Sequence, residues 1–128
     1  CANNRQSVFD EMRMATLMAK ARLTDGGAMD AATALRRGTT GGADVLGLPV
    51  GSLEAGKRAD LVALDLDDLS LFPPQHLEHH VVNSMQPTAI SKVMVAGEVV
   101  VEGGRTTKVD PAEIRSRVET VTEGWARP

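Results

Sequence analysis

The sequence has little cysteine, few aromatic residues and no excess of positive charge. Its 128 residues include a single cysteine, Cys1, and only two Phe and one Trp, with no Tyr. A single thiol cannot form a disulfide within the chain, so the sequence is typical of a reducing compartment and we expect a cytoplasmic protein. With so few rings, the core must be built from aliphatic side chains, and there is little aromatic surface for stacking on bases.

Neither the charge nor the hydropathy favours a nucleic acid or a membrane as partner. Fourteen Lys and Arg against 17 Asp and Glu give a net charge of -3, and a chain without a basic run cannot neutralise a row of phosphates. The longest apolar stretch, residues 93–101, is interrupted by Gly97 and Glu98 and is far shorter than the roughly 20 residues of a membrane span. The length of 128 residues and the ordinary content of hydrophobic and charged residues predict a single globular domain.

Hydrophobic periodicity predicts two helices in the first part of the chain. One is expected from Ser7 to about Leu23, capped by Ser7 with Asp10 three residues on. Its predicted apolar face consists of Val8, Met12, Ala15 and Ala19. The second is expected to begin at Asp30 and to stop at Gly47. It contains three glycines, each costing about 1 kcal/mol relative to alanine, so we expect it to pack closely against a neighbour. These glycines are Gly38, Gly41 and Gly42.

From residue 50 onward the pattern changes to short strands. Strands are predicted over residues 61–66, 90–95, 98–101 and 105–109, with tight turns at 96–97 and 103–104. Three consecutive strands and one upstream form half a sandwich or a small open sheet, whose edges need cover. A final helix is predicted to begin at Asp110 and Pro111. Its apolar stripe, which we expect to dock on another surface, consists of Ile114, Val118, Val121 and Trp125.

The three histidines are the first candidates for a metal site. His76 and His79 would share one helical face, but zinc needs a third and usually a fourth ligand, and no distant Cys or His can supply them. We therefore interpret His76, His79 and His80 as solvated or structurally satisfied. The glycine pairs at 41–42 and 103–104 have neither the Walker spacing nor that of a dinucleotide-binding loop, so we interpret them as structural.

Cys1 gives an alternative function, because an N-terminal thiol beside its own α-amino group is the arrangement of self-processed hydrolases. Against this, Cys1 leads into a helix rather than a strand, and the chain is short for such an enzyme. The simpler interpretation of a chain that starts with Cys and not Met is a trimmed product or part of a longer polypeptide. A third hypothesis is a non-catalytic β-sandwich module that binds a partner.

Four segments carry a resemblance to a known family. In chain order they are CANN with FDEMR (residues 1–4 and 9–13), ALRRGTTGGADVLG (34–47), GSLEAGKRADLV (51–62) and VMVAGEVVVEGGR (93–105). Together they resemble the C-terminal region of the amidohydrolase superfamily, in the branch of cytosine deaminases, S-adenosylhomocysteine/methylthioadenosine deaminases and triazine chlorohydrolases. The third segment is the most specific, since it is similar to the family's Gly-Ser-Leu-x-x-Gly-Lys-x-Ala-Asp-Leu-Val return into its small sandwich domain.

The resemblance implies an α/β fold class: the C-terminal fragment of a metal-dependent (β/α)8 TIM-barrel hydrolase, with part of its composite β-sandwich domain. Residues 1–49 would form the last helices of the barrel, residues 50–109 the C-terminal half of the sandwich, and residues 110–128 a C-terminal helix. In the implied reaction, a hydroxide activated by a divalent metal, zinc or iron, attacks an amino- or chloro-substituted ring carbon and releases ammonia or chloride. Hydrolytic deamination of a small purine- or pyrimidine-like heterocycle is the expected activity.

The family's metal ligands do not fall on this chain. They are a His-x-His pair, two later histidines and an Asp expected just before Cys1, and the three histidines here match none of them. We therefore expect this segment alone to bind no catalytic metal and to be inactive. Asn3 and Asn4, closest to that Asp, are the expected substrate-binding residues, with a role at the helix entry as the alternative. The expected partners are the remainder of the same polypeptide, the substrate and a second copy in a homo-oligomer.

Overall fold

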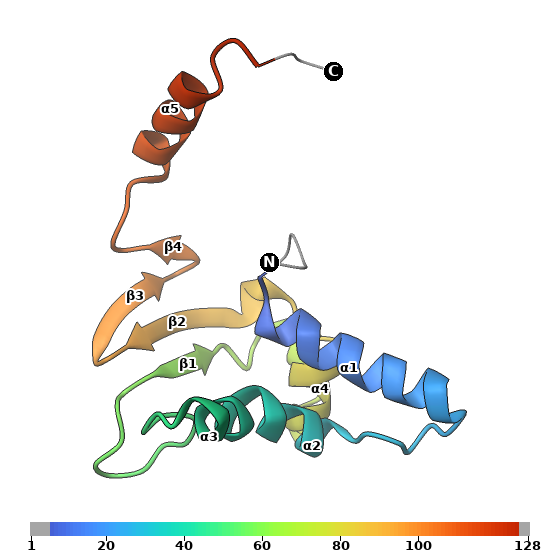
Figure 1. The fold of residues 1–128 in the computed structure, drawn as a ribbon. Coiled ribbons are helices and arrows are strands. Elements are labelled where there is room, and N and C mark those ends of the chain that lie inside the picture. Colours follow the sequence, from blue (N-terminus) through green and yellow to red (C-terminus); the bar gives the residue numbers. More distant parts are fainter. Residues whose placement is uncertain (1–5, 126–128) are drawn as a thin grey trace.

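The computed structural model describes residues 6–125 and combines helices with one antiparallel sheet (Figure 1). The elements in chain order are α1 (Val8–Leu23), α2 (Ala31–Arg36), the π-helix η1 (Arg37–Gly41), α3 (Gly42–Leu46), β1 (Leu61–Leu64), the 3-10 helices η2 (Leu69–Leu71) and η3 (Pro74–His76), α4 (Leu77–Asn83), the 3-10 helix η4 (Pro87–Ala89), β2 (Ile90–Val95), β3 (Glu98–Glu102), β4 (Arg105–Thr106) and α5 (Pro111–Val121). This mixture of helix and strand agrees with the predicted α/β class.

The ends of the first two predicted helices are confirmed. Ser7 Oγ accepts a hydrogen bond from the Asp10 backbone N–H at 3.3 Å, and α1 begins at the next residue after Ser7. The Asp30 carboxylate accepts the Thr33 N–H at 2.7 Å at the start of α2. The second helix ends at Gly47, whose φ of 63° is left-handed, as suits a glycine at a helix C-terminus.

The predicted inward face of α1 is right at Met12, which is buried, and wrong at Val8 and Ala15. Val8 is 58% exposed and Ala15 is also exposed, whereas Met12 and Thr16 are buried. The face that packs is rotated toward Met12, Thr16 and Phe9, because both α2 and α4 lie against that side of the helix. Thr16 can be buried because its hydroxyl donates to the Arg13 carbonyl at 2.7 Å.

The second predicted helix is interrupted by a π-helix, which the sequence pattern does not predict. Residues Arg37–Gly41 form this wider turn between α2 and α3. Close packing at a glycine is confirmed within this π-helix, because a Cβ added at Gly38 would lie 2.5 Å from Met12 Sδ. It is not confirmed at Gly42, which has no atom within 4 Å of such a Cβ.

The helical core is small and consists of two adjoining clusters. The buried residues of the first are Met12, Ala34 and Val82, and those of the second are Leu71, Val81 and Ala89. Phe9 and Leu35 pack against both clusters, so the two form one continuous core. The stretch over residues 76–85, which the sequence leaves ambiguous, is helical in α4 and contributes Val81 and Val82 to this core.

The sheet follows the chain order β1-β2-β3-β4, and each strand is antiparallel to the next. Both predicted turns are confirmed, since positive φ values occur at Ala96 and Gly97 and again at Gly103 and Gly104, the pattern of two-residue hairpin turns. The last strand is shorter than predicted, because pairing ends at Thr106. No residue of these four strands is fully buried, so neither face of the sheet is completely covered by residues 6–125.

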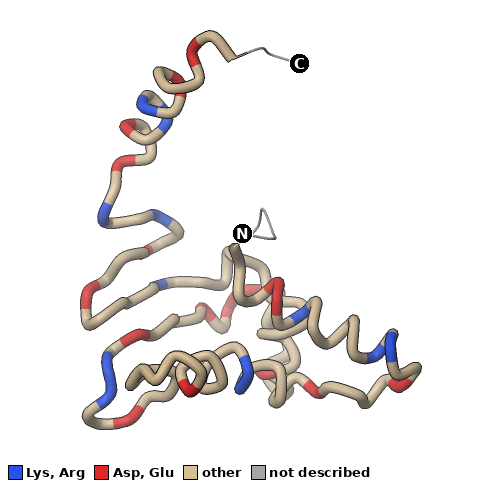
Figure 2. The backbone as a smooth tube through the Cα atoms, viewed as in Figure 1, with Lys and Arg blue, Asp and Glu red and all other residues tan. Residues whose placement is uncertain are grey.

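Helix α5 lies beyond β4, away from the other elements (Figure 1). It begins as predicted, with the Asp110 carboxylate accepting the Ala112 N–H at 2.9 Å and Pro111 in the first turn. All of its residues are exposed, so the docking expected for its apolar stripe does not take place on any element within residues 6–125. No helix over these residues has the length and hydropathy of a membrane span. Figure 2 shows Lys and Arg scattered among Asp and Glu along the chain, with no basic run.

Candidate functional site

The predicted substrate-binding residues Asn3 and Asn4 lie outside the described residues, and so does Cys1. Their roles stay predictions. The residues that can be placed are the three histidines and the motif of residues 51–62, which carried the family resemblance.

The histidines lie around the start of α4. His76 and His79 line an open groove of about 440 Å³ together with Asp30, Gln75 and Glu78. The rings of His79 and His80 meet edge to face with their centroids 6.2 Å apart. Over residues 6–125, no three side chains of His, Cys, Asp or Glu are placed to hold a metal ion together. The groove therefore has polar groups but no ligand set for zinc.

The motif of residues 51–62 starts with a glycine that no other residue can replace without strain. Gly51 has a φ of 89°, and a Cβ added there would lie 2.9 Å from both the Thr39 carbonyl oxygen and Thr40 Cα. These are backbone atoms of the π-helix η1, which cannot rotate away as the end of a side chain could. The loop after α3 thus packs directly against the backbone of η1.

A serine, a glutamate and a lysine form a hydrogen-bonded cluster within the same motif. Ser52 Oγ donates to Glu54 Oε1 at 2.5 Å, and Lys57 Nζ donates to Ser52 and, at 3.1 Å, to Glu54. These hydrogen bonds, with that from Ser52 the largest cause, lower the pKa of Glu54. All three side chains lie within six residues of one another in the sequence and bond to each other. We therefore interpret the cluster as closing a turn.

Asp60, near the end of the motif, links the loop to the sheet. Its carboxylate accepts hydrogen bonds from Arg58 Nη2 and from the Ala96 backbone N–H, both at 2.6 Å. The Gly97 N–H donates to the Ala59 carbonyl beside it at 2.9 Å. The motif thus joins η1 at one end to the β2–β3 turn at the other, and sequence reasoning missed this link because the two partners are 36 positions apart.

The Asp60 link predicts a pH-dependent stability. The hydrogen bond from Arg58, followed by that from Ala96, lowers the pKa of Asp60 below its usual value. A carboxyl with a lowered pKa contributes stability above its unfolded pKa of about 3.9, and the contribution is lost as the pH falls through the folded value. Asp60→Asn should therefore lower the melting temperature at pH 7, and its difference from the wild type should shrink below about pH 4.

Thermal unfolding measured at a series of pH values tests this prediction. The control is Asp67→Asn, at an exposed carboxylate in the loop after β1, which should change the melting temperature much less at pH 7. A difference between Asp60→Asn and the wild type that is as large at pH 3 as at pH 7 would contradict it.

The sequence pattern of the amidohydrolase family matches residues 1–100. The chain belongs to the amidohydrolase family. The matched part includes α1, the helix pair around η1, the segment of residues 51–62 and β2, and it ends within β3. Membership in this family favours neither an N-terminal cysteine hydrolase nor a non-catalytic module.

Curated relatives of this amidohydrolase chain share about a third of its residues. The 5-methylthioadenosine/S-adenosylhomocysteine deaminase of Natronomonas pharaonis is 34% identical over 118 residues, which are 92% of this chain and 27% of that protein. The protein of the same name from Thermotoga maritima is 32% identical over 94% of this chain and 29% of its own length. The chain thus spans little more than a quarter of the length of the relatives it matches.

Solved structures of similar hydrolases superpose on this chain. An adenosine deaminase from Xanthomonas campestris with bound zinc has a TM-score of 0.87 and 34% identity, covering 95% of this chain and 28% of its own. A zinc complex of atrazine chlorohydrolase from Arthrobacter aurescens TC1 has a TM-score of 0.78 and 26% identity, covering 88% of this chain and 26% of its own. The residues described here do not fit a zinc ion themselves, because they lack a ligand set.

Proposed function

We propose that the polypeptide carrying this amidohydrolase chain is a zinc-dependent aminohydrolase that deaminates an adenosine-type substrate such as 5-methylthioadenosine or S-adenosylhomocysteine. The observation that carries the proposal is the 34% identity over 92% of the chain to a deaminase of that name. The superposition on an adenosine deaminase gives further support. In the reaction, water is consumed, the bond between the ring carbon and its amino nitrogen is broken, a carbonyl is formed and ammonia leaves.

In this proposal, residues 6–125 support the active site and do not supply its reacting groups. The zinc is held by residues outside those described, since no ligand set is found among them. Asn3 and Asn4 are proposed to contact the substrate, and the segment alone is proposed to be inactive. A cytoplasmic location and a homo-oligomer complete the proposal.

The proposed architecture places residues 1–49 in the last helices of a (β/α)8 barrel. Residues 50–109 would form the C-terminal half of a composite sandwich, and residues 110–128 a C-terminal helix. Two features support this assignment. The strands contain no buried residue, so their faces are available to further layers. In addition, the regular elements between residues 6 and 46 are all helices, as expected where the barrel strands lie elsewhere in the polypeptide.

Ammonia release by the complete polypeptide tests the function. We expect release from 5-methylthioadenosine, S-adenosylhomocysteine or adenosine, and a loss of at least about 100-fold in rate after chelation, restored by zinc. The matched controls are His76→Ala and His79→Ala, which should keep the zinc content and the rate because these histidines are not proposed as ligands. An unchanged rate after complete removal of zinc would contradict the proposal.

Dechlorination is the second candidate function, because the superposition on atrazine chlorohydrolase favours it. It predicts chloride release from a chlorotriazine and no ammonia from adenosine-type compounds. The same protein preparation can be assayed for both products, and chloride release without ammonia would replace the first candidate by the second.

A further inference from the structure

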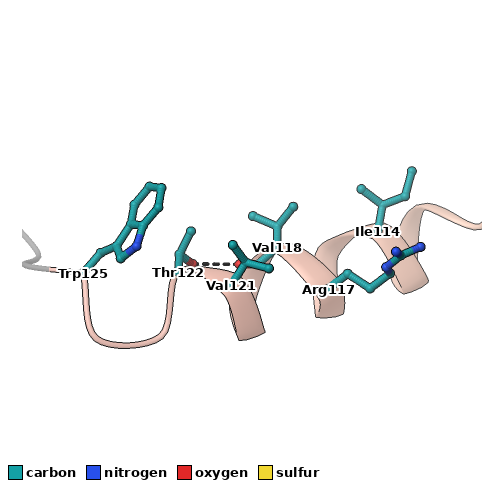
Figure 3. Close-up of a pocket in the computed structure, with 6 residues that line it drawn as sticks. All are labelled: Ile114, Arg117, Val118, Val121, Thr122 and Trp125. Carbon is teal, nitrogen blue, oxygen red and sulfur yellow. Dashed lines mark hydrogen bonds between the residues drawn. The ribbon is translucent and has the colours of Figure 1, made fainter.

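The apolar stripe of α5 is the surface of this chain that no function described so far uses. Its residues are Ile114, Val118, Val121 and Trp125, spaced by four, three and four positions, and we call them the α5 stripe. That spacing places them on one side of the helix and of the turn that follows it. They are between 48% and 72% exposed. With Arg117 and Thr122 they line an open groove of about 540 Å³, in which their side chains stand side by side (Figure 3).

The α5 stripe needs a covering surface for the helix to be stable. α5 has 11 residues, fewer than the roughly 12–15 below which an isolated helix is marginal in water. None of its residues is buried by the other elements of residues 6–125. Helices of this length owe most of their stability to the packing of an apolar face, and this face is available.

The position of α5 is nevertheless well defined. The segment before α5 is hydrogen-bonded to β3. The Thr107 N–H donates to the Val100 carbonyl at 3.0 Å, and the Thr107 hydroxyl donates to the Val99 carbonyl at 2.6 Å. Lys108 forms an ion pair with Glu98 on the same strand. The match to the solved adenosine deaminase covers 95% of the chain and so leaves out only about six of its 128 residues. At least part of α5, which has 11 residues, therefore belongs to the part that superposes.

We propose that the α5 stripe is an intramolecular docking surface, covered by the part of the same polypeptide that lies outside these residues. The superposed adenosine deaminase has 72% of its chain beyond the matched 28%, so it contains ample chain to cover α5 in this position. The inference depends on the length of the polypeptide and not on the reaction proposed above, so either can fail while the other holds.

A second copy of the chain is a weaker occupant than the same polypeptide. A helix of 11 residues is about 16 Å long and about 10 Å across, so one face of it covers on the order of 160 Å². Stable interfaces between proteins bury about 800 Å² on each partner. A surface on the same polypeptide needs far less area, because tethering gives it an effective concentration in the millimolar range.

Alkylation of cysteines introduced into the complete polypeptide tests the proposal. Val118→Cys places a thiol in the α5 stripe at little change of volume. Ser116→Cys is the matched control, since a position two residues away points to the opposite side of the helix. We expect iodoacetamide to modify Cys at 118 at least about tenfold more slowly than at 116, because the thiol is reached only after local opening. Mass spectrometry of the α5 peptide measures each rate.

The concentration dependence separates the two occupants. Protection that is the same in concentrated and dilute protein supports intramolecular cover. Equal alkylation rates at the two positions, or protection that disappears on dilution as dimers dissociate, would overturn the proposal. Val121→Cys repeats the measurement at a second point of the stripe if Val118→Cys does not give the wild-type circular dichroism spectrum.

Discussion

Gly51→Ala is expected to destabilise the protein by about 2–5 kcal/mol, through two additive effects. The first effect is backbone strain. Gly51 has a φ of 89°, and the left-handed region costs a residue with a Cβ about 1–2 kcal/mol. The second is a steric clash, because the new Cβ would lie 2.9 Å from backbone atoms of Thr39 and Thr40, and overpacking costs about 1–3 kcal/mol. Urea unfolding measures the sum.

Gly56→Ala is the matched control, since it carries the backbone effect without the clash. Gly56 has a φ of 90°, and no atom lies within 4 Å of an added Cβ. It should therefore cost about 1–2 kcal/mol, and the difference between the two variants measures the contact between the loop and η1. If Gly51→Ala lowered the free energy of unfolding no more than Gly56→Ala, the contact between the loop and η1 would contribute nothing to stability.

Leu71→Ala is expected to cost about 2–5 kcal/mol in the free energy of unfolding, the range for removing a buried leucine side chain. Leu71 is fully buried in the core cluster that also contains Val81 and Ala89, so the substitution leaves a cavity between α4, η2 and η4. Chemical denaturation, with the slope compared between variants, is the measurement.

Leu69→Ala makes the same chemical change two positions away, in the same 3-10 helix. Leu69 is 87% exposed, so its truncation should stay within about 0.5 kcal/mol of the wild type. A large effect at both positions would show that the 3-10 helix η2 itself, and not the burial of one side chain, is what the substitutions disturb.

The ends of the helices could be predicted because helix caps are local. Ser7, Asp30 and Asp110 each accept a backbone N–H from a residue two or three positions on, so the whole interaction is contained in a few letters of sequence. The hairpin turns at 96–97 and 103–104 follow from the same kind of local preference for positive φ.

The faces of the helices could not be predicted, because they depend on what packs against them. Ala34 and Ala43 are nine positions apart and would lie on opposite sides of an unbroken α-helix, since nine residues make about two and a half turns. Both are buried, but only Ala34 belongs to one of the two core clusters, so different parts of the chain cover the two alanines. A pattern based on a period of 3.6 residues predicts one buried side and does not contain the second.

The candidate site was accessible from sequence only through resemblance. The motif of residues 51–62 identifies the family, but the structure explains why these residues are needed. Gly51 packs against the backbone of Thr39 and Thr40, and the Asp60 carboxylate accepts a hydrogen bond from the Ala96 N–H. Contacts of this kind join residues whose spacing in sequence carries no periodic signal. Counting metal ligands, by contrast, needs no structure, and the histidines failed that count from the sequence alone.

The junction between the helices and the sheet determines how this part of the protein can open. Leu64 at the end of β1 packs against the cluster that contains Ala89, which directly precedes β2. Among residues 6–125, Leu64 is the strand residue named among the hydrophobic side chains that pack against the two core clusters. We therefore expect the sheet and the helices to share little buried surface, so that a fluctuation can break the ladder of strands while the helical core stays closed.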